Sequence, residues 1–319
     1  MSTATIARFL LLALLWGSSF SFIKMSLEGL TPSQIVLGRL LLGAVVLLAT
    51  ARLRRVGLPR IGRIWGHVAI AALLGNVVPF LLLSVGEQTT SAGVAGVLIG
   101  STPLLTLALA AALLPTDRAT PRKAAGLLLG FLGVVLVIGP WRESLGSVDG
   151  QLACLGAALS YAAGFVYVRK YLSPNGLAPL ALAASQLAAA AVVQAVATPF
   201  LPWQTPHVTL RVTVGIVILG LLGTGVAYVL YFRLIGDLGA TTASSVNYVV
   251  PVAAVLISTS LLAEPATWNL LVGCLFVLSG VALAENRLGR HRQGTRAGSI
   301  GVAHPLTGSA SNDAVGTRR

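Results

Sequence analysis

Arg39 is the residue of this sequence with the clearest chemical implication, because it is a cation inside a long apolar run. It lies about six residues into that run, roughly 9 Å from the nearer end at ~1.5 Å per helical residue. A charge at that depth in an apolar solvent is costly and marks a candidate site. We interpret Arg39 as a binding group for an anion. The alternatives are a side chain that snorkels to the nearer polar boundary, or a structural pair with Glu87.

Two other charged residues lie near the ends of apolar runs. Lys24 is a candidate binding group, with simple snorkelling as the alternative. Glu87 is the acidic residue nearest to the apolar interior in the first half of the chain, and a carboxyl group partly removed from water can exchange protons. The alternative is a solvated carboxylate at a helix end. Glu264, at the matching place in the second half, is a weaker candidate of the same kind.

Trp16 lies in the middle of an apolar run, beside small residues and Phe20. Tryptophan is enriched at membrane interfaces, so a central position needs another explanation. A large ring next to small side chains suits the wall of a cavity that stacks a flat or apolar molecule, and helix packing is the alternative. Weaker candidates of the same kind are Tyr161, Tyr167, Tyr228 and Tyr231.

Two prolines, Pro103 and Pro251, interrupt apolar runs at matching places in the two halves of the chain. Each proline lacks a backbone N–H, and this frees the carbonyl group four residues earlier. Paired interruptions of this kind point to a central binding site. The side chains that can supply hydrogen bonds there are Ser101, Thr102, Asn247 and Tyr248. The alternative is that the prolines only kink packed helices and that the hydroxyl groups bond to their own backbone.

The composition shows which solvent surrounds these residues. Of the 319 residues, 55% are hydrophobic and only 10% are charged, and the mean hydropathy is +0.87. A soluble domain has about a quarter of its residues charged, so this chain is expected to lie in a membrane. The two cysteines are far apart in apolar runs, which excludes a disulfide framework or a cysteine-based zinc site.

Ten apolar runs are long enough to cross a bilayer, which takes about 20 residues as a helix. They are Ile6 to Met25, Ser33 to Ala51, Ile64 to Val85, Thr90 to Leu114, Arg122 to Pro140, Gly150 to Tyr171, Leu177 to Leu201, Leu210 to Leu234, Gly239 to Ala263, and Trp268 to Ala284. The runs lack the alternating pattern of a membrane β-barrel. We therefore predict an all-α integral membrane protein with ten transmembrane helices. Residues 287–319 are polar and predicted to form a disordered tail.

The basic residues predict the orientation of these helices. If both termini lie on one side, that side collects 18 of the 22 Lys and Arg residues, as the cytoplasmic side of a membrane protein does. Both termini are therefore expected in the cytoplasm, with the protein in a plasma (inner) membrane. Arg outnumbers Lys by 19 to 3, which is compatible with a bacterial source. Orientation also accounts for the net charge of +13, so no nucleic-acid partner is expected.

The two halves of the chain resemble each other weakly. At an offset of 148, Pro103 aligns with Pro251, and at an offset of 145, Trp16 aligns with Tyr161. We predict one five-helix unit at 1–145 and a second at 146–286. Five crossings are an odd number, so the two units would be inverted repeats, the usual design of secondary transporters with alternating access.

Three motifs resemble the EamA-type transporters of the drug/metabolite transporter superfamily. The first runs from Leu11 to Leu48 and reads LLALLWGSSFSFIKMSLEGLTPSQIVLGRLLLGAVVLL. The second is the pair Gly100 to Pro103 and Asn247 to Pro251, and the third is Leu262 to Pro265. The resemblance implies ten helices in two EamA repeats, cytoplasmic termini, and export or exchange of small metabolites, amino acids or drugs. The substrate-binding candidates are Trp16, Phe20, Lys24, Arg39, Ser101, Thr102, Tyr161, Asn247 and Tyr248.

Other functions fit the sequence less well. An intramembrane enzyme needs catalytic groups within the spans, but all four histidines lie at span ends, in loops or in the tail, and no nucleotide-binding loop is present. We therefore expect no catalytic residue, metal or cofactor. A membrane scaffold or sensor without transport activity is the remaining alternative. We expect a small-molecule substrate and the lipid bilayer as partners, with Glu87 as the candidate for proton coupling. The oligomeric state is left open.

Overall fold

The fold was analysed in a computed structural model, which describes residues 2–60, 62–113, 120–139, 147–239 and 243–284. The chain divides into two units, Met1–Glu285 and Asn286–Arg319. The predicted tail at 287–319 lies outside the described residues. All helices of the described residues belong to the first unit.

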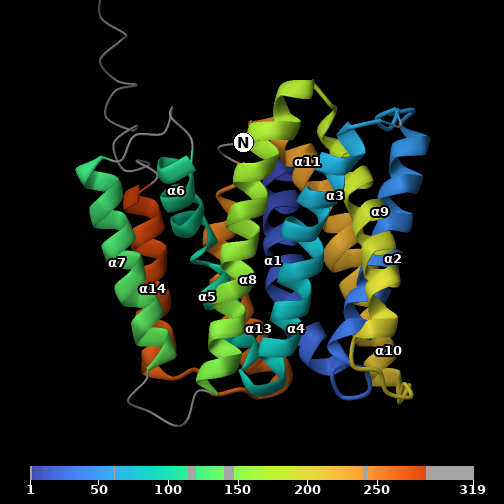
Figure 1. The fold of residues 1–319 in the computed structure, drawn as a ribbon. Helices are drawn as coiled ribbons and strands as arrows, with labels where there is room; N and C mark the ends of the chain where they lie inside the picture. Colours follow the sequence, from blue (N-terminus) through green and yellow to red (C-terminus); the bar gives the residue numbers. More distant parts are fainter. Residues whose placement is uncertain (1, 61, 114–119, 140–146, 240–242, 285–319) are drawn as a thin grey trace, which may run out of the picture. The chain divides into compact units, whose positions relative to one another are not determined.

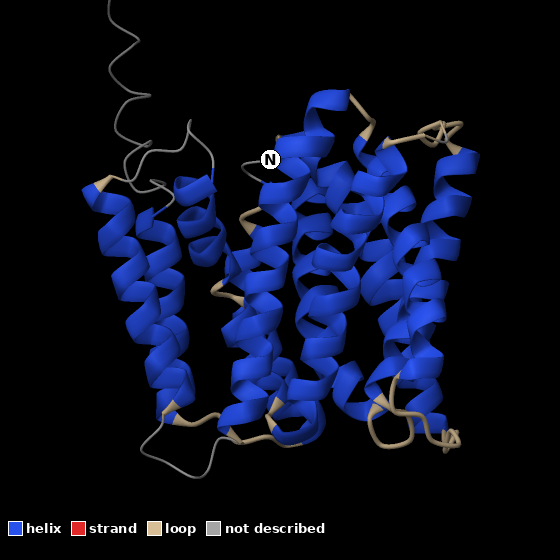
Figure 2. Ribbon diagram, in the orientation of Figure 1, coloured by secondary structure: helices blue, strands red, loops and turns tan. Residues whose placement is uncertain are grey.

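The described residues form helices joined by short connections, and Figure 2 shows no strand among them. The α-helices are α1 (Thr3–Ser26), α2 (Pro32–Leu53), α3 (Ile64–Ala72), α4 (Val78–Thr89), α5 (Ala92–Ile99), α6 (Thr102–Leu113), α7 (Pro121–Ile138), α8 (Val148–Tyr167), α9 (Pro179–Ala197), α10 (Leu210–Val217), α11 (Ala227–Leu238), α13 (Val246–Leu262) and α14 (Trp268–Ala284). The π-helical segments are η1 (Leu73–Val77), η3 (Val168–Leu172) and η6 (Ile218–Val226), and the 3₁₀ segments are η4 (Ser173–Asn175) and η5 (Thr198–Phe200).

Eight helical stretches of the described chain are long and apolar enough to cross a membrane. They correspond to the first eight predicted spans, so the chain is a multi-pass membrane protein. The tenth predicted span coincides with α14, whereas the ninth, Gly239 to Ala263, contains the shorter helix α13; both helices are apolar but have 17 residues each. A total of ten crossings therefore stays a prediction.

Several predicted spans are divided where the sequence predicts one helix. The run from Thr90 to Leu114 consists of α5 and α6, separated by a turn at Gly100 and Ser101. In the second half, the turn comes earlier, at Ser244 and Ser245, and Pro251 lies inside the continuous helix α13. Only the first proline thus stands at a helix break, because Pro103 is the second residue of α6. Residues 240–242 lie outside the described chain.

Small residues allow the helices to approach one another closely. The helices α7 and α14 run side by side (Figure 1) and make extensive mutual contacts. A Cβ atom added at Gly126 or Gly133 of α7 would meet the backbone of α14, and one added at Gly273 or Gly280 would meet the backbone of α7. Gly17 of α1 approaches α13 in the same way. These glycines thus serve helix packing, as small residues do in membrane bundles.

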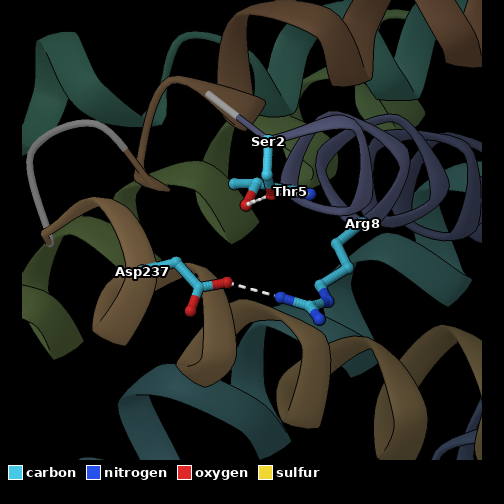
Figure 3. Close-up of polar contacts among 4 residues, drawn as sticks. All are labelled: Ser2, Thr5, Arg8 and Asp237. Atoms are coloured by element: carbon cyan, nitrogen blue, oxygen red, sulfur yellow. Dashed lines mark hydrogen bonds and ion pairs between the residues drawn. The ribbon is translucent and has the colours of Figure 1, made fainter.

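The helix α1 is attached to its neighbours at both ends. Figure 3 shows the first turn, where the side chain of Ser2 faces Thr5 and Arg8 faces Asp237 of α11. The Arg8 Nη1 to Asp237 Oδ2 distance is 2.6 Å. At the other end, Lys24 binds the end of α4. Between these ends, α1 contacts α13, α5, η6, α10 and α11.

Candidate functional site

Arg39 lies on α2 with its guanidinium group held between two other helices. The side chain is 7% exposed, and its Nε donates a hydrogen bond of 2.8 Å to the Thr224 hydroxyl in η6. Its Cζ lies 3.6 Å from the centre of the Phe80 ring of α4, which is cation–π geometry. Among the described residues no ion pair joins Arg39 to Glu87. The structural pair between these two residues, one of the alternatives for Arg39, is therefore not formed.

The position of Thr224 depends on a local departure from α-helical geometry. Its hydroxyl donates a hydrogen bond of 3.0 Å to the Leu219 carbonyl, five residues earlier, within the π-helical segment η6. The helical stretch at the corresponding place in the first half, Ile64–Thr89, also contains a π-helical segment, η1. Segments of this kind occur often at functional sites. The sequence gives no direct signal for them, because no residue type specifies a bond between residues five apart.

Aromatic side chains gather near Arg39 from several helices. The Trp16 ring of α1 lies 5.3 Å from the Tyr231 ring and 6.4 Å from the Tyr228 ring, both on α11. The Tyr161 ring of α8 lies 6.3 Å from the Phe80 ring, and Tyr161 and Tyr228 are both within electrostatic range of the Arg39 guanidinium. Trp16, Tyr161 and Arg39, three of the predicted candidates, are thus brought into one region. Trp16 is half-buried there.

Lys24 and Glu87 meet at the end of α4, but their side-chain charges do not pair. Lys24 Nζ donates hydrogen bonds to the backbone carbonyls of Glu87, at 2.5 Å, and of Thr90, at 2.9 Å. Lys24 therefore caps the C-terminus of α4, where a cation is favourable. The carboxyl group of Glu87 is fully buried, and neither oxygen has a hydrogen-bond partner among the described residues. It is thus not the solvated helix-end carboxylate of the alternative interpretation.

Glu264 has a structural role in this conformation. Its two carboxyl oxygens accept hydrogen bonds from the backbone N–H groups of Ala92, at 3.0 Å, and Gly93, at 3.2 Å. These are the first residues of α5, so the carboxylate caps that helix from the other half of the chain. The sequence did not indicate this cap, because the two partners are more than 170 residues apart.

The hydroxyl groups beside Pro103 bond to their own backbone. Ser101 Oγ donates to the Leu98 carbonyl at 2.6 Å, and Thr102 Oγ1 donates to the Ile99 carbonyl at 2.7 Å. Thr102 thereby satisfies the carbonyl group that Pro103 leaves without a donor. Ser101 also borders an apolar groove of about 230 Å³ between α6, α7 and α8, and Arg39 is not among the residues that line this groove.

The remaining candidates lie in packed regions. Phe20 is buried in the main hydrophobic cluster, against Gly96 of α5. Tyr248 packs against the same cluster, and Asn247 precedes it on α13 with partial exposure. Two residues of the site, Phe80 and Thr224, were not predicted. Phe80 gave no signal within its apolar run, whereas Thr224 is a polar residue in the glycine-rich stretch GLLGTG, a pattern that could have drawn attention.

The fold and the site describe a helical, multi-pass membrane protein with a buried arginine between its helices. The EamA-like transporter family matches this chain twice, over residues 3–139 and 149–285. The chain therefore belongs to the EamA-like transporter family and has its two-repeat architecture. Both matched ranges fall within the two units predicted from the sequence.

Similar proteins are named as transporters whose activity is uncharacterised. The chain is 31% identical to the uncharacterised transporter YdfC of Bacillus subtilis, over 84% of this chain and 86% of that protein. It is 28% identical to the uncharacterised inner membrane transporter YedA of Escherichia coli K12, over 78% of this chain and 80% of that protein. A solved structure titled "Crystal structure of protein" superposes with a TM-score of 0.65 at 22% identity, covering 92% of this chain and all of that one. This last likeness concerns the fold alone.

Proposed function

We propose that this protein is a secondary transporter that exports or exchanges a small molecule carrying an anionic group. The observation that carries the proposal is Arg39, a buried cation with no ion-pair partner among the described residues. A guanidinium has five N–H donors, and the bond to Thr224 uses the Nε–H. Its terminal N–H groups match a carboxylate or phosphate group, which arginine binds through two parallel hydrogen bonds.

The aromatic residues near Arg39 extend the proposed site. Tyr228 of α11 lies within electrostatic range of Arg39, and the Trp16 ring of α1 packs against Tyr228 and Tyr231. Ring surfaces of this kind favour the apolar part of a substrate, while a few polar groups fix its orientation. The proposed substrate is therefore a small metabolite, amino acid or drug with one anionic group and one apolar part.

Alternating access is the proposed mechanism, with the two five-helix units as inverted repeats and ten membrane crossings. The helix contacts support this symmetry. The helix α1 of the first unit contacts α13 of the second, and its counterpart α8 contacts α5 and α6, which take the place of α13 in the first unit. In the same way, α1 contacts α10 and α11 of the second unit, and α8 contacts η1 and α4 at the corresponding place in the first. The bond between Arg39 and Thr224 joins the two proposed units, so a movement of one unit against the other changes the surroundings of the substrate group. Both termini are proposed to lie in the cytoplasm.

A counterflow screen with the purified protein in liposomes tests this function. The liposomes are loaded with a panel of anionic, neutral and cationic metabolites, and exchange with labelled compounds is measured. We expect exchange of at least one anionic compound, and its loss in Arg39→Gln. Arg211→Gln is the matched control, because Arg211 is exposed and its guanidinium group pairs with the exposed Glu28 carboxylate. Exchange confined to cationic or neutral compounds, or unchanged in Arg39→Gln, contradicts the proposed site. The complete absence of exchange would favour a scaffold or sensor.

A further inference from the structure

The carboxyl group of Glu87 is the most unusual buried group outside the Arg39 site. It is 0% exposed, and both of its oxygens lack a hydrogen-bond partner in the described part of the chain. A carboxylate ion in such surroundings would be an uncompensated buried charge, which is strongly unfavourable. We propose that Glu87 binds a proton in this conformation and releases it in another, so that transport is coupled to a proton gradient. The coupling rests on the proposed transport function, whereas the proton binding does not.

The charged and titratable groups around Glu87 come from the helices packed against α4 and from the connection between α13 and α14. Lys24 of α1 and Arg39 of α2 are the cations within electrostatic range, and Glu264 is the acidic group. The Cys154 thiol of α8 is within electrostatic range of both Glu87 and Lys24. The segments α5 and η1 also contact α4, but their sequences, AGVAGVLI and LLGNV, contain no titratable side chain. No group of this set forms an ion pair or hydrogen bond with the Glu87 carboxyl group.

The position of Lys24 distinguishes this arrangement from an ordinary ion pair. Its ammonium group is within hydrogen-bond distance of the Glu87 backbone carbonyl and of the Thr90 carbonyl, but it does not bond to the Glu87 side chain. The hydroxyl groups of Ser21, one turn before Lys24 on α1, and of Thr90 are also buried, and neither has a hydrogen-bond partner among the residues that the structure describes. The region therefore holds a cation, Lys24, and two hydroxyl groups that could stabilise an ionised Glu87 side chain. In this conformation none of them bonds to the Glu87 carboxyl group.

The proposed step follows from these contacts. When the ends of α1 and α4 separate, water reaches Glu87, the O–H bond of its carboxyl group breaks, and the proton passes to that water. The Lys24 ammonium group then leaves the backbone carbonyls of Glu87 and Thr90 and binds the Glu87 carboxylate, which stabilises the negative charge. Rebinding of a proton restores the neutral acid and allows the helices to close. One proton crosses the membrane per cycle when Glu87 releases it to water on one side and binds the next proton from water on the other side, and no other reactant is required.

Infrared difference spectroscopy tests the proton binding without any substrate. The full-length protein is reconstituted in lipid and studied at neutral pH, together with Glu87→Gln, which keeps the shape of the side chain but cannot ionise. We expect the C=O stretch of a protonated carboxylic acid in the unchanged protein and its loss in Glu87→Gln. Glu28→Gln is the control, because Glu28 is partly exposed and pairs with Arg211. An acid band that is absent from the unchanged protein, or that persists in Glu87→Gln, overturns the proposal.

Two further measurements complete the test. Glu87→Gln must keep the helical content and size-exclusion profile of the unchanged protein, so that loss of the band reflects the carboxyl group. A pH gradient is then imposed on liposomes that exchange the compound found in the counterflow screen. We expect Glu87→Gln to keep exchange but to lose accumulation driven by the gradient. Accumulation that is unchanged in Glu87→Gln, or that follows a sodium gradient alone, overturns the coupling. A lost acid band with no exchange of any compound would instead refute the proposed function.

Discussion

Replacing Thr224 with valine tests how firmly Arg39 is anchored. Valine keeps the branched shape of threonine, so the contact of this side chain with Gly43 of α2 is preserved, but the hydroxyl group is lost. Two hydrogen bonds disappear: the one accepted from Arg39 at 2.8 Å and the one donated to Leu219 at 3.0 Å. A bond to a charged group contributes about 1.5–3 kcal/mol and a neutral one about 0.5–1.5 kcal/mol in soluble proteins. Bonds between membrane helices average only about 0.6 kcal/mol.

We therefore expect Thr224→Val to lower the free energy of unfolding by about 1–3 kcal/mol. The measurement is a reversible unfolding titration with sodium dodecyl sulfate in mixed micelles. Thr213→Val is the matched control, because the Thr213 hydroxyl is exposed and bonds to the carbonyl of Thr209, the residue that precedes its own helix α10. The control should change the free energy of unfolding by less than about 0.5 kcal/mol. Equal effects of the two substitutions would refute the view that Thr224 satisfies a buried guanidinium.

Two further predictions concern the contacts at the helix ends. Glu264→Gln should lower the free energy of unfolding by about 1 kcal/mol, because a neutral amide with one acceptor oxygen replaces a carboxylate that caps α5 with two. The same titration measures it, and a variant as stable as the unchanged protein contradicts the cap. Asp237→Asn should lower thermal stability by at most about 1 kcal/mol, since its pair with Arg8 is partly exposed. That difference should shrink at high salt, and a salt-independent effect would exclude the ion pair as its cause.

The sequence predicted the membrane-spanning helices well, because apolar length is a direct requirement of the bilayer. The first predicted span, Ile6 to Met25, corresponds to Thr3–Ser26, and the second, Ser33 to Ala51, to Pro32–Leu53. The second helix starts at Pro32 because a capping box precedes it: the Thr31 side chain accepts a hydrogen bond from the Gln34 backbone N–H, and the Gln34 side chain accepts one from the Thr31 backbone N–H. Boundaries of this kind depend on neighbouring residues and can therefore be predicted.

The breaks inside the helices could not be predicted in the same way. Pro103 and Pro251 are equivalent in sequence, yet a helix break occurs only at Pro103, while α13 continues through Pro251. The difference depends on what each helix packs against, since neighbouring helices can accommodate the missing hydrogen bond. The π-helical segments are a further example, because their bonds reflect packing around η1 and η6 more than residue type.

The candidate site was only partly visible in the sequence. Arg39 and Trp16 stood out because charge and a central tryptophan are rare in apolar runs. Their partners Phe80, Tyr228 and Thr224 are ordinary membrane residues, and only the fold brings them together. The roles of Lys24 and Glu264 also needed the structure, because both cap helices that are distant in sequence. Charge thus indicated where to look, and tertiary contacts determined what each group binds.

Direct binding of a substrate to the Arg39 site is the most decisive measurement. Isothermal titration calorimetry would compare the unchanged protein with Arg39→Gln and with the Arg211→Gln control, using the anionic compound that counterflow identifies. A bond to a charged group contributes about 1.5–3 kcal/mol, so Arg39→Gln should raise the Kd by about 10- to 100-fold. The control should leave the Kd unchanged. An equal Kd for Arg39→Gln and the unchanged protein would contradict the claim that Arg39 holds the substrate.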